Sequence, residues 1–504
     1  MRRAKLTDEA DFVIIGTGAG GATAARVLSG AGFSVVMLEE GRKLETAERG
    51  RGLLASMGQS FRDLGTTTTA GRFPMPMLQG RCVGGSTAIN SGIIWRTPED
   101  VCAEWSERHG LGELVEARAL ERAFDTIEDE LGVHETDAEV LGGNSGRMEE
   151  ACRLLGLPGR VMHRNTKDCK GRGQCLQGCP GEARQSMDVS YVPRTIAAGG
   201  RLHAQCRAER IVVRGGRAVG VEGVVLDGER KRVGKFEMAA RRGVVLAASV
   251  TCTPGLLMAS GVRAGVGAGF MAHPGVAMVG RFPMPVAMSF GATQGYEVPL
   301  RARRLKLESL SLPPEMLAAR LPGAGAEWQE RLTDLDHYAQ WAGVIRMRAV
   351  GRIARTLGGG TAVRYMPTGE DLATAREALA LMAEMMLTAG ATEVFPGVTG
   401  WPEVVRDMRG AQALETAPVA HGSFHFMASH LFGGALAGRD PATSVVGADL
   451  ETHAVRDLFV MDSSVFPTNL GVNPQHSIMA IVWNAAEKLA NRERTATARS
   501  STAA

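Results

Sequence analysis

The stretch DFVIIGTGAGGATAARVLSGAGFSVVMLEEG, residues 11–41, decides the fold of this 504-residue chain. Residues 12–15 form a short apolar run that favours a buried strand, and residues 22–28 have the composition of a helix. A second apolar run follows at residues 34–38. This order predicts a β-strand, an α-helix and a parallel β-strand, the unit from which dinucleotide-binding sheets are built.

The turn between the first strand and the helix carries the pattern Gly-x-Gly-x-x-Gly at Gly16, Gly18 and Gly21. In such a turn the first glycine permits a tight bend, the second lets the backbone approach a pyrophosphate, and the third lets the helix pack on the strand. Glu39 ends the second strand, where an acidic side chain accepts hydrogen bonds from ribose hydroxyls, and Glu40 is its neighbouring competitor. The segment predicts dinucleotide binding, with a surface turn as the alternative, and it does not distinguish NAD from FAD.

The composition excludes several classes of protein. Lys and Arg number 57 against 54 Asp and Glu, a net charge of +3 that gives no reason to expect nucleic acid or an anionic membrane as a partner. No apolar run reaches the roughly 18 residues of a membrane-spanning helix. No apolar segment of signal length follows the basic start, and eight cysteines are too sparse for a disulfide framework. We therefore expect a cytoplasmic protein with a small-molecule partner, and its length predicts two domains or one with a large insertion.

A second glycine-rich stretch, GRCVGGSTAINSG, occupies residues 80–92. It is either a turn-rich loop or a nest of backbone N–H donors that holds a phosphate or a ring edge. Here the sequence resembles the glucose-methanol-choline (GMC) oxidoreductase family, flavoproteins that carry a GR-x-x-GGSS-x-x-N-G stretch after an N-terminal FAD fingerprint. The matching residues are Arg81, Gly84, Gly85, Ser86 and Asn90, with Thr87 in place of the usual second serine. The resemblance implies that FAD is the cofactor and that this loop lies against it.

The resemblance extends to residues 429–489 near the C-terminus. Family members have there a histidine followed by glycines, a strand that ends in Asp-x-Ser, a proline, and an Asn-Pro or a histidine before the last helix. The corresponding residues of this chain are His430, Gly433, Gly434, Asp462, Ser464, Pro467, Asn473 and Pro474. The resemblance implies cofactor contacts at Asp462, Ser463 and Pro474. The spacing from Pro467 places the second catalytic position of the family on Asn473 and not on His476.

The chemistry that the resemblance implies is oxidation of an alcohol to an aldehyde or ketone by hydride transfer to flavin N5. His430 would be the general base that accepts the hydroxyl proton. Asn473 cannot titrate, but its amide can donate a hydrogen bond to the substrate oxygen. This His–Asn pair resembles that of the cholesterol oxidases, although Ala435 stands where many relatives have cysteine. The alternative for His430 is a satisfied core histidine, and we interpret His476 as a residue at the start of a helix.

Two segments between the ends complete the resemblance. Residues 244–262 predict a buried strand and a helix, and the family places there the strand that closes the FAD sheet. Ser249 replaces a glycine that is common in the family, which weakens the expectation of a flavin contact there. Residues 203–213 resemble the strand whose backbone meets the adenine, which places Ala208 at that contact. His273 is expected to be structural.

A cysteine-rich stretch, residues 168–186, suggests a different function. Cys169, Cys175 and Cys179 resemble an iron–sulfur ligand run, and some sugar dehydrogenases of the family carry such a cluster. Their spacing is loose, so we favour a structural loop and predict no metal. Two alternatives to alcohol oxidation stay open: a dehydrogenase subunit with an iron–sulfur cluster, and a flavoprotein of the same fold with a non-redox lyase or isomerase activity.

The expected fold is of the α/β class, with a Rossmann-like FAD-binding domain and an α+β substrate domain that contains an antiparallel sheet. We assign residues 1–100, 180–285 and 425–504 to the FAD-binding domain, 101–179 to a connecting or cap segment, and 286–424 to the substrate domain. Met382, Met385 and Met386 are expected in the core, although a methionine-rich wall would also suit a lipophilic alcohol. The polar tail from residue 491 is expected to be disordered. The electron acceptor is left open among O2, a quinone and a carrier protein.

Overall fold

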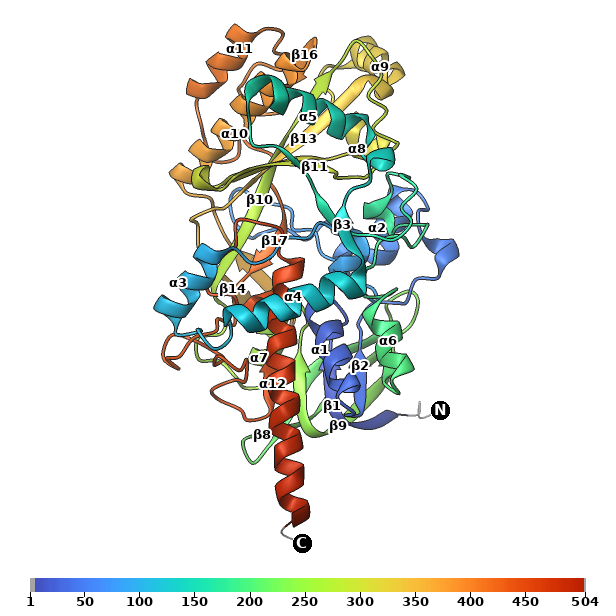
Figure 1. Ribbon diagram of the computed structural model, residues 1–504, viewed down its shortest axis with the longest axis vertical. Coiled ribbons are helices and arrows are strands. Elements are labelled where there is room, and N and C mark those ends of the chain that lie inside the picture. The colour runs from blue at the N-terminus through green and yellow to red at the C-terminus, as the bar shows by residue number, and fades with distance from the viewer. Residues whose placement is uncertain (1–4, 503–504) are drawn as a thin grey trace.

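The computed structural model describes residues 5–502, which form two large β-sheets surrounded by helices (Figure 1). The sheet that contains the N-terminal strand lies in the lower half of Figure 1, and the second sheet lies in the upper half. Each sheet is packed within its own hydrophobic core. This arrangement confirms the predicted combination of a Rossmann-like sheet with an antiparallel sheet.

The first sheet has seven strands in the order β6-β2-β1-β9-β8-β7, and β18 also pairs with β9. Their bounds are β1 Leu6–Ile15, β2 Val35–Leu38, β6 Arg201–His203, β7 Cys206–Arg214, β8 Arg217–Leu226, β9 Arg232–Leu246 and β18 Leu458–Val460. Strands β6, β2, β1, β9 and β18 are parallel, whereas β7 and β8 form an antiparallel extension. The later part of β9 pairs with β18, so the C-terminal segment of the chain returns to the sheet that the N-terminus begins.

The predicted strand–helix–strand unit is confirmed. The residues of β1 and β2 are in parallel register from Phe12 opposite Val35 to Ile15 opposite Leu38. These paired residues are buried, as expected for parallel strands covered on both faces. Helix α1 (Ala19–Gly30) connects the two strands and packs against α12 (Gln475–Thr502).

The second sheet has nine strands in the order β15-β14-β10-β13-β12-β11-β4, with β16 and β17 also paired to β10. Their bounds are β4 Arg160–Val161, β10 Ala268–Arg281, β11 Tyr296–Leu300, β12 Leu305–Ser309, β13 Tyr338–Ile345, β14 Gly351–Arg355, β15 Thr361–Arg364, β16 Glu393–Phe395 and β17 Met427–Phe432. All of its pairings are antiparallel. A separate two-stranded sheet joins β3 (Val133–Glu135) to β5 (His163–Asn165).

The antiparallel sheet includes three strands from outside residues 286–424, the segment assigned to the substrate domain. Strands β10 and β17 fall within residues assigned to the FAD-binding domain, and β4 falls within the connecting segment, yet all three belong to the antiparallel sheet. The reason is hydrogen bonding over long sequence separations: β10 pairs with both β13 and β17. Such pairings leave no mark on the local sequence.

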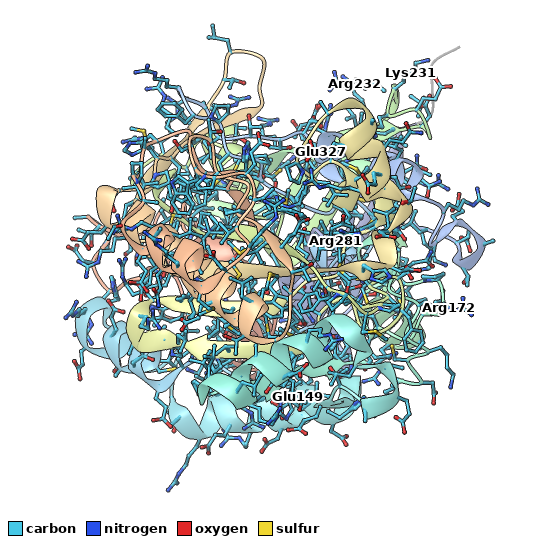
Figure 2. All side chains as sticks on the ribbon, turned by 90° about the horizontal axis from the view of Figure 1, so that it is seen from above. Glu149, Arg172, Lys231, Arg232, Arg281 and Glu327 are labelled. Atoms are coloured by element: carbon cyan, nitrogen blue, oxygen red, sulfur yellow. The ribbon has the colours of Figure 1, made fainter. Side chains whose placement is uncertain are left out.

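The remaining helices cover the outside of the two sheets. They are α2 Leu53–Ser60, α3 Glu99–His109, α4 Ala117–Leu131, α5 Gly142–Leu155, α6 Tyr191–Ala197, α7 Thr253–Ala259, α8 Pro314–Ala318, α9 Gly325–Thr333, α10 Gly369–Thr388 and α11 Met408–Ala413. Of the helices between residues 5 and 502, none combines the length and the apolar character needed to cross a membrane. Charged side chains such as Arg172 and Lys231 are exposed at the periphery of the molecule (Figure 2).

The methionine cluster of α10 is part of the core. Met382, Met385 and Met386 are all fully buried and belong to the hydrophobic core of the second sheet. A Cβ added at Gly280 of β10 would fall 2.8 Å from the sulfur of Met386, so helix and strand are in close contact. The core interpretation is confirmed for these three residues.

The prediction of a disordered tail is wrong for residues 491–502, because α12 continues through Thr502. Ionic and backbone contacts fix the extended helix. Arg492 Nη1 lies 2.7 Å from Glu451 Oε2, and Arg494 Nη2 donates to the Ala31 carbonyl over 2.7 Å. The last two residues of the predicted tail lie outside the described residues.

We expect the substitution Met382→Ala to lower the free energy of unfolding by about 2–5 kcal/mol, because it leaves a cavity in a closed core. Urea denaturation of the purified protein measures this loss. The control Met366→Ala removes an exposed side chain and should cost about 0.5 kcal/mol or less. A changed dependence of the reaction rate on substrate chain length in Met382→Ala would contradict the core assignment and support a substrate-facing wall.

Candidate active site

The first glycine motif combines two packing glycines with one that faces open space. Gly16 has a φ of +95°, and a Cβ there would fall 2.2 Å from the Ala247 carbonyl oxygen. A Cβ at Gly21 would fall 2.0 Å from the Gly16 oxygen, so both positions require glycine. Gly18 differs, because its φ is −70° and an added Cβ would meet only the Gly85 Cα, at 4.0 Å. The space above Gly18, at the start of α1, fits a phosphate group that approaches the helix N-terminus.

The second glycine motif lies against the first. Gly84 and Gly85 have φ angles of +92° and +54°, in the left-handed region that favours glycine. A Cβ at Gly85 would fall 2.9 Å from the Gly18 Cα, so the two backbones meet with no side chain between them. The Gly84 N–H donates to Thr17 Oγ1 over 3.1 Å. Two segments 67 residues apart in sequence therefore form one continuous backbone surface.

Glu39 and the start of β7 lie together at the end of β2. The Glu39 carboxylate accepts hydrogen bonds from the Thr17 N–H (3.1 Å), the Thr17 hydroxyl (2.8 Å) and the Gly41 N–H (2.8 Å). Burial raises the pKa of this carboxyl group, against the effect of those donors. The Cys206 N–H donates to the Glu39 carbonyl over 2.8 Å, which brings the strand of Ala208 to the same edge. The ribose contact of Glu39 and the adenine contact of Ala208 stay predictions.

The neighbouring acidic residue, Glu40, has a different role. Its carboxylate pairs with Arg62 Nη2 at 2.9 Å and with Arg81 Nη1 at 3.8 Å. The ion pair with Glu40 therefore holds Arg81 beside the first sheet. Ser86 accepts a hydrogen bond from the Gly80 N–H over 3.0 Å and closes its own loop.

Asn90 connects the second glycine motif to the C-terminal segment. Its Nδ2 donates to Gln475 Oε1 over 2.6 Å, and its Oδ1 accepts from the Gly92 N–H over 2.9 Å. Gln475 is the first residue of α12 and follows Pro474 directly. The hydrogen bond ties the glycine-rich loop to the loop that carries Asn473. The cofactor contacts predicted for Asn90 and Pro474 stay predictions.

Asp462 and Ser463 hold the end of β18 against its neighbours. Asp462 Oδ2 accepts from the Ser249 N–H (3.0 Å) and the Thr253 hydroxyl (2.6 Å), and burial raises the pKa of this carboxyl group. The Ser463 hydroxyl donates to the Leu431 carbonyl of β17 over 2.9 Å. Ser249 has a φ of +79°, the left-handed region in which a side chain is strained and glycine is favoured. These bonds fix β17 relative to the first sheet.

His430 lies on β17, where it is paired with His273 of β10. The two rings are 5.7 Å apart in an edge-to-face arrangement. Among the described residues, Nδ1 of His430 is buried without a hydrogen-bond partner, whereas the side chain as a whole is only half-buried. The free edge of the ring is therefore the one that carries Nε2. Burial lowers the pKa of His430 to about 4, with Lys306 adding to this effect and Glu308 opposing it.

The loop that carries Asn473 is held by the second sheet. The Gly471 N–H donates to His273 Nε2 over 2.9 Å, so the histidine that pairs with His430 also anchors this loop. Arg346 Nε donates to Asn469 Oδ1 over 3.1 Å from the end of β13. His273 thus links the two candidate catalytic residues, a role beyond the structural one expected from sequence.

Three buried charged side chains, Lys306, Glu297 and Glu308, form a cluster that contacts Asn473 through Lys306. The ammonium group of Lys306 donates to Asn473 Oδ1 and pairs with Glu297 Oε2 at 2.6 Å and Glu308 Oε1 at 2.7 Å. All three side chains of the cluster are buried. Burial disfavours the ammonium form, but the two carboxylates raise the pKa of Lys306 above its ordinary value.

Sequence analysis missed this cluster, although β12 contained a signal. Its residues alternate, with Leu305 and Leu307 in the hydrophobic core and Lys306 and Glu308 on the opposite face. Charged residues in such a pattern indicate an exposed face. Here that face is covered by other parts of the chain, which only the tertiary structure shows.

His476 is the second residue of α12, which confirms its predicted place at a helix start. Its ring is fully buried and lies 4.7 Å from the ring of Phe124. His476 Nε2 is 2.9 Å from Glu128 Oε1 of α4. Burial lowers the pKa of His476, against the effect of Glu128. The contacts of this side chain are thus directed at α4.

The cysteine-rich loop holds its sulfur atoms against arginine and backbone donors. Arg164 Nη2 donates to Cys175 Sγ over 3.3 Å, and the Arg184 N–H donates to Cys179 Sγ over 3.4 Å. Within residues 5–502, no group of three or more His, Cys, Asp or Glu side chains is placed to hold a metal ion.

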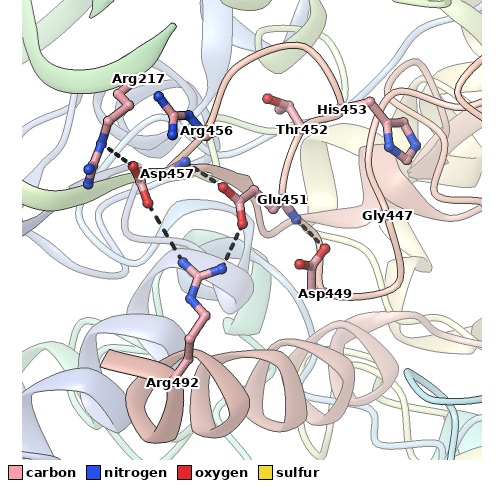
Figure 3. Close-up of a pocket in the computed structure, with 9 residues that line it drawn as sticks. All are labelled: Arg217, Gly447, Asp449, Glu451, Thr452, His453, Arg456, Asp457 and Arg492. Atoms are coloured by element: carbon pink, nitrogen blue, oxygen red, sulfur yellow. Dashed lines mark hydrogen bonds and ion pairs between the residues drawn. The ribbon is translucent and has the colours of Figure 1, made fainter. Parts of the chain in front are cut away.

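A surface hollow of about 480 Å³ lies elsewhere, between the β8 end of the first sheet and α12 (Figure 3). Arg217 Nε pairs with Asp457 Oδ2 at 2.6 Å, and Arg492 pairs with Glu451. These four charged side chains compensate one another, and the hollow contains none of the predicted site residues.

The fold combines a dinucleotide-type parallel sheet with an antiparallel sheet that carries His430 on β17, and Asn473 lies in the loop before α12. Comparison with protein families identifies the class of protein: the chain matches the GMC oxidoreductase family over residues 10–275, the N-terminal part of the family, and 360–481, the C-terminal part. The chain belongs to this family.

Similar proteins cover almost the whole chain. An uncharacterized GMC-type oxidoreductase of Mycobacterium tuberculosis is 34% identical over 95% of this chain and 75% of its own length. A long-chain-alcohol oxidase of Arabidopsis thaliana is 26% identical over 96% of this chain and 67% of its own length. The crystal structure of formate oxidase from Aspergillus oryzae is 15% identical, with a TM-score of 0.73 over 98% of this chain and 100% of that one. The last likeness shows a shared fold.

Members of the GMC family bind FAD, which confirms the predicted cofactor. The residues present fit this group. The contact between Gly18 and Gly85 leaves a backbone surface above the start of α1 that no side chain fills, as a pyrophosphate requires. The individual residues predicted to touch FAD stay predictions.

We expect Gly18→Val to fold but to purify with little FAD. The φ of Gly18 suits any residue and the chain itself leaves room there, so the added side chain occupies only the space of the pyrophosphate. Flavin absorbance per mole of protein measures the loss, and circular dichroism checks the fold. Gly20→Val is the contrasting variant, because a Cβ there would fall 1.8 Å from the Met461 oxygen and should prevent folding. Full flavin occupancy in Gly18→Val would show that the pyrophosphate lies elsewhere.

Proposed function

We propose that this protein is an FAD-dependent enzyme that oxidises an alcohol to an aldehyde or ketone. His430 accepts the hydroxyl proton, and Asn473 donates a hydrogen bond to the substrate oxygen. FAD supplies the acceptor for the hydride. The observation that carries the proposal is the connection through His273, which pairs with His430 on one side and anchors the Asn473 loop through Gly471 on the other.

Proton transfer to His430 is supported by its protonation state. Its pKa of about 4 keeps the imidazole neutral at pH 7, with a lone pair available on one ring nitrogen. Nδ1 is buried, so Nε2 is the nitrogen that a substrate hydroxyl can reach. An ordinary histidine has a pKa of about 6.5. The structure indicates a weaker base, because the site is desolvated and holds an ammonium group nearby.

Asn473 complements the base because it cannot carry charge. Its side chain is buried, and an amide donor in such a site stabilises negative charge that develops on the substrate oxygen. A carboxylate in this position would lack the donor. The division of the two tasks between His430 and Asn473 therefore follows from the chemistry of their side chains.

The alcohol class is supported by the Arabidopsis relatives, which are long-chain-alcohol oxidases. We propose an alcohol with an apolar chain as the first substrate to test. The methionines of α10 do not support this choice, because they are buried in the core.

The proposed compartment is the cytoplasm. All eight cysteines lie in the described part of the chain and are free, which supports a reducing compartment.

The decisive experiment is flavin reduction under anaerobic conditions across primary and secondary alcohols of increasing chain length. We expect an alcohol to bleach the flavin of the wild-type protein, and we expect His430→Ala to slow this reduction by about 100-fold or more, the scale of a lost general base. FAD content should not change. His476→Ala is the matched control. Loss of the contact with Glu128 should lower the stability of the protein, but the rate of flavin reduction should not change.

Two results would contradict the proposal. Absence of bleaching by every alcohol would favour a non-redox reaction or another substrate class. A severe loss in His476→Ala beside a mild one in His430→Ala would move the base to His476.

The pH dependence tests the environment of His430. A base with a pKa of about 4 is unprotonated throughout the neutral range, so kcat/KM should stay constant down to about pH 5 and fall as the pH drops through 4. An exposed histidine would instead lose activity near its ordinary pKa of about 6.5. Samples returned to pH 7 after each measurement control for irreversible acid damage. A profile centred near 6.5 would show that His430 is solvated.

A further inference from the structure

The neighbours of Asn473 determine the orientation of its side-chain amide. An asparagine side chain presents an oxygen acceptor on one side and an NH2 donor on the other, and its neighbours decide which atom faces which direction. The neighbour here is the ammonium group of Lys306, which can only donate. The atom that faces Lys306 is therefore Oδ1.

This argument requires that Lys306 keeps its charge, because a neutral amine could also accept. Glu297 and Glu308 are directly opposed on the antiparallel strands β11 and β12, and Lys306 lies within 2.7 Å of both carboxylates. Their negative charge outweighs the cost of burial and raises the pKa of Lys306. The lysine is thus an ammonium ion at neutral pH.

The cluster is also fixed in position. Glu297 accepts hydrogen bonds from Trp95 Nε1 at 2.9 Å and Arg160 Nε at 2.8 Å. Glu308 accepts from Gln294 Nε2 at 2.6 Å. A lysine held between two such carboxylates cannot turn away from Asn473 without leaving a buried charge unpaired, which is strongly unfavourable.

We propose that Lys306 is a positioning residue, which holds Oδ1 of Asn473 so that its NH2 group is presented to the substrate oxygen. In the described part of the chain, Nδ2 of Asn473 donates to no other group, so this donor is available for a ligand. The inference rests on the proposed function, because it assigns Lys306 to the reaction through Asn473.

A double-mutant cycle tests the proposal. The variants are Lys306→Met, Asn473→Ala and the combination, all in a Glu308→Gln background. This background keeps the buried charge balanced when the lysine is removed, since Glu297 retains Arg160. The measured quantity is the anaerobic rate constant of flavin reduction at saturating alcohol, with flavin content determined for each variant.

We expect Asn473→Ala to slow reduction by about 100-fold, as the loss of one such donor does. Lys306→Met should slow it by about 10-fold when Asn473 is present, and by less than about 2-fold when residue 473 is alanine, because it acts through the amide. If Lys306→Met slows reduction equally with asparagine and with alanine at residue 473, the proposal is overturned and the role of Lys306 is merely structural.

A second measurement does not depend on catalysis. Crystal structures of the Glu308→Gln protein with and without Lys306→Met should differ at Asn473, whose side chain is expected to leave its single orientation when the lysine is lost. An unchanged Asn473 side chain would overturn the positioning role. If Asn473→Ala does not slow reduction but the orientation does change, the proposed function of Asn473 fails while the positioning by Lys306 holds.

Discussion

The antiparallel pairing of β10 with β17 is the interaction on which the candidate active site depends. It places His430 opposite His273, although the two residues are far apart in sequence. Because His273 also accepts a hydrogen bond from Gly471, the same strand pair sets the position of the loop that ends at Asn473. One set of strand hydrogen bonds therefore determines where both candidate catalytic side chains lie.

The cofactor surface is built differently from the catalytic site. The turn from Gly16 to Gly21 is set by local sequence, because its glycines allow backbone contacts that any side chain would block. The second motif adds Gly85, which reaches Gly18, and Gly84, which donates to Thr17, and both contacts form only after the chain has folded back. A short and specific motif could therefore be recognised in sequence, and its docking partner could be recognised only through a family resemblance.

Buried charge is the main departure from ordinary core packing in this protein. Lys306, Glu297 and Glu308 are removed from water at a substantial desolvation cost. The cost is offset because each group has an opposite charge or a hydrogen-bond donor within about 3 Å. Apolar residues of similar size would pack in such a place more simply, so the cluster is best explained by what it does to its neighbours, Asn473 and His430.

The sequence by itself determined four features: the Rossmann-like unit, the FAD motif, the core position of the α10 methionines and the helix start at His476. Each of these depends on residues that are close to one another in the chain. The tertiary structure decided which strands share a sheet, the low pKa of His430 and the role of Lys306. The physical reason is that strand pairing and desolvation arise between residues distant in the chain. The alternation of Leu305, Lys306 and Leu307 was visible in sequence, but only the folded chain shows that its charged face is buried.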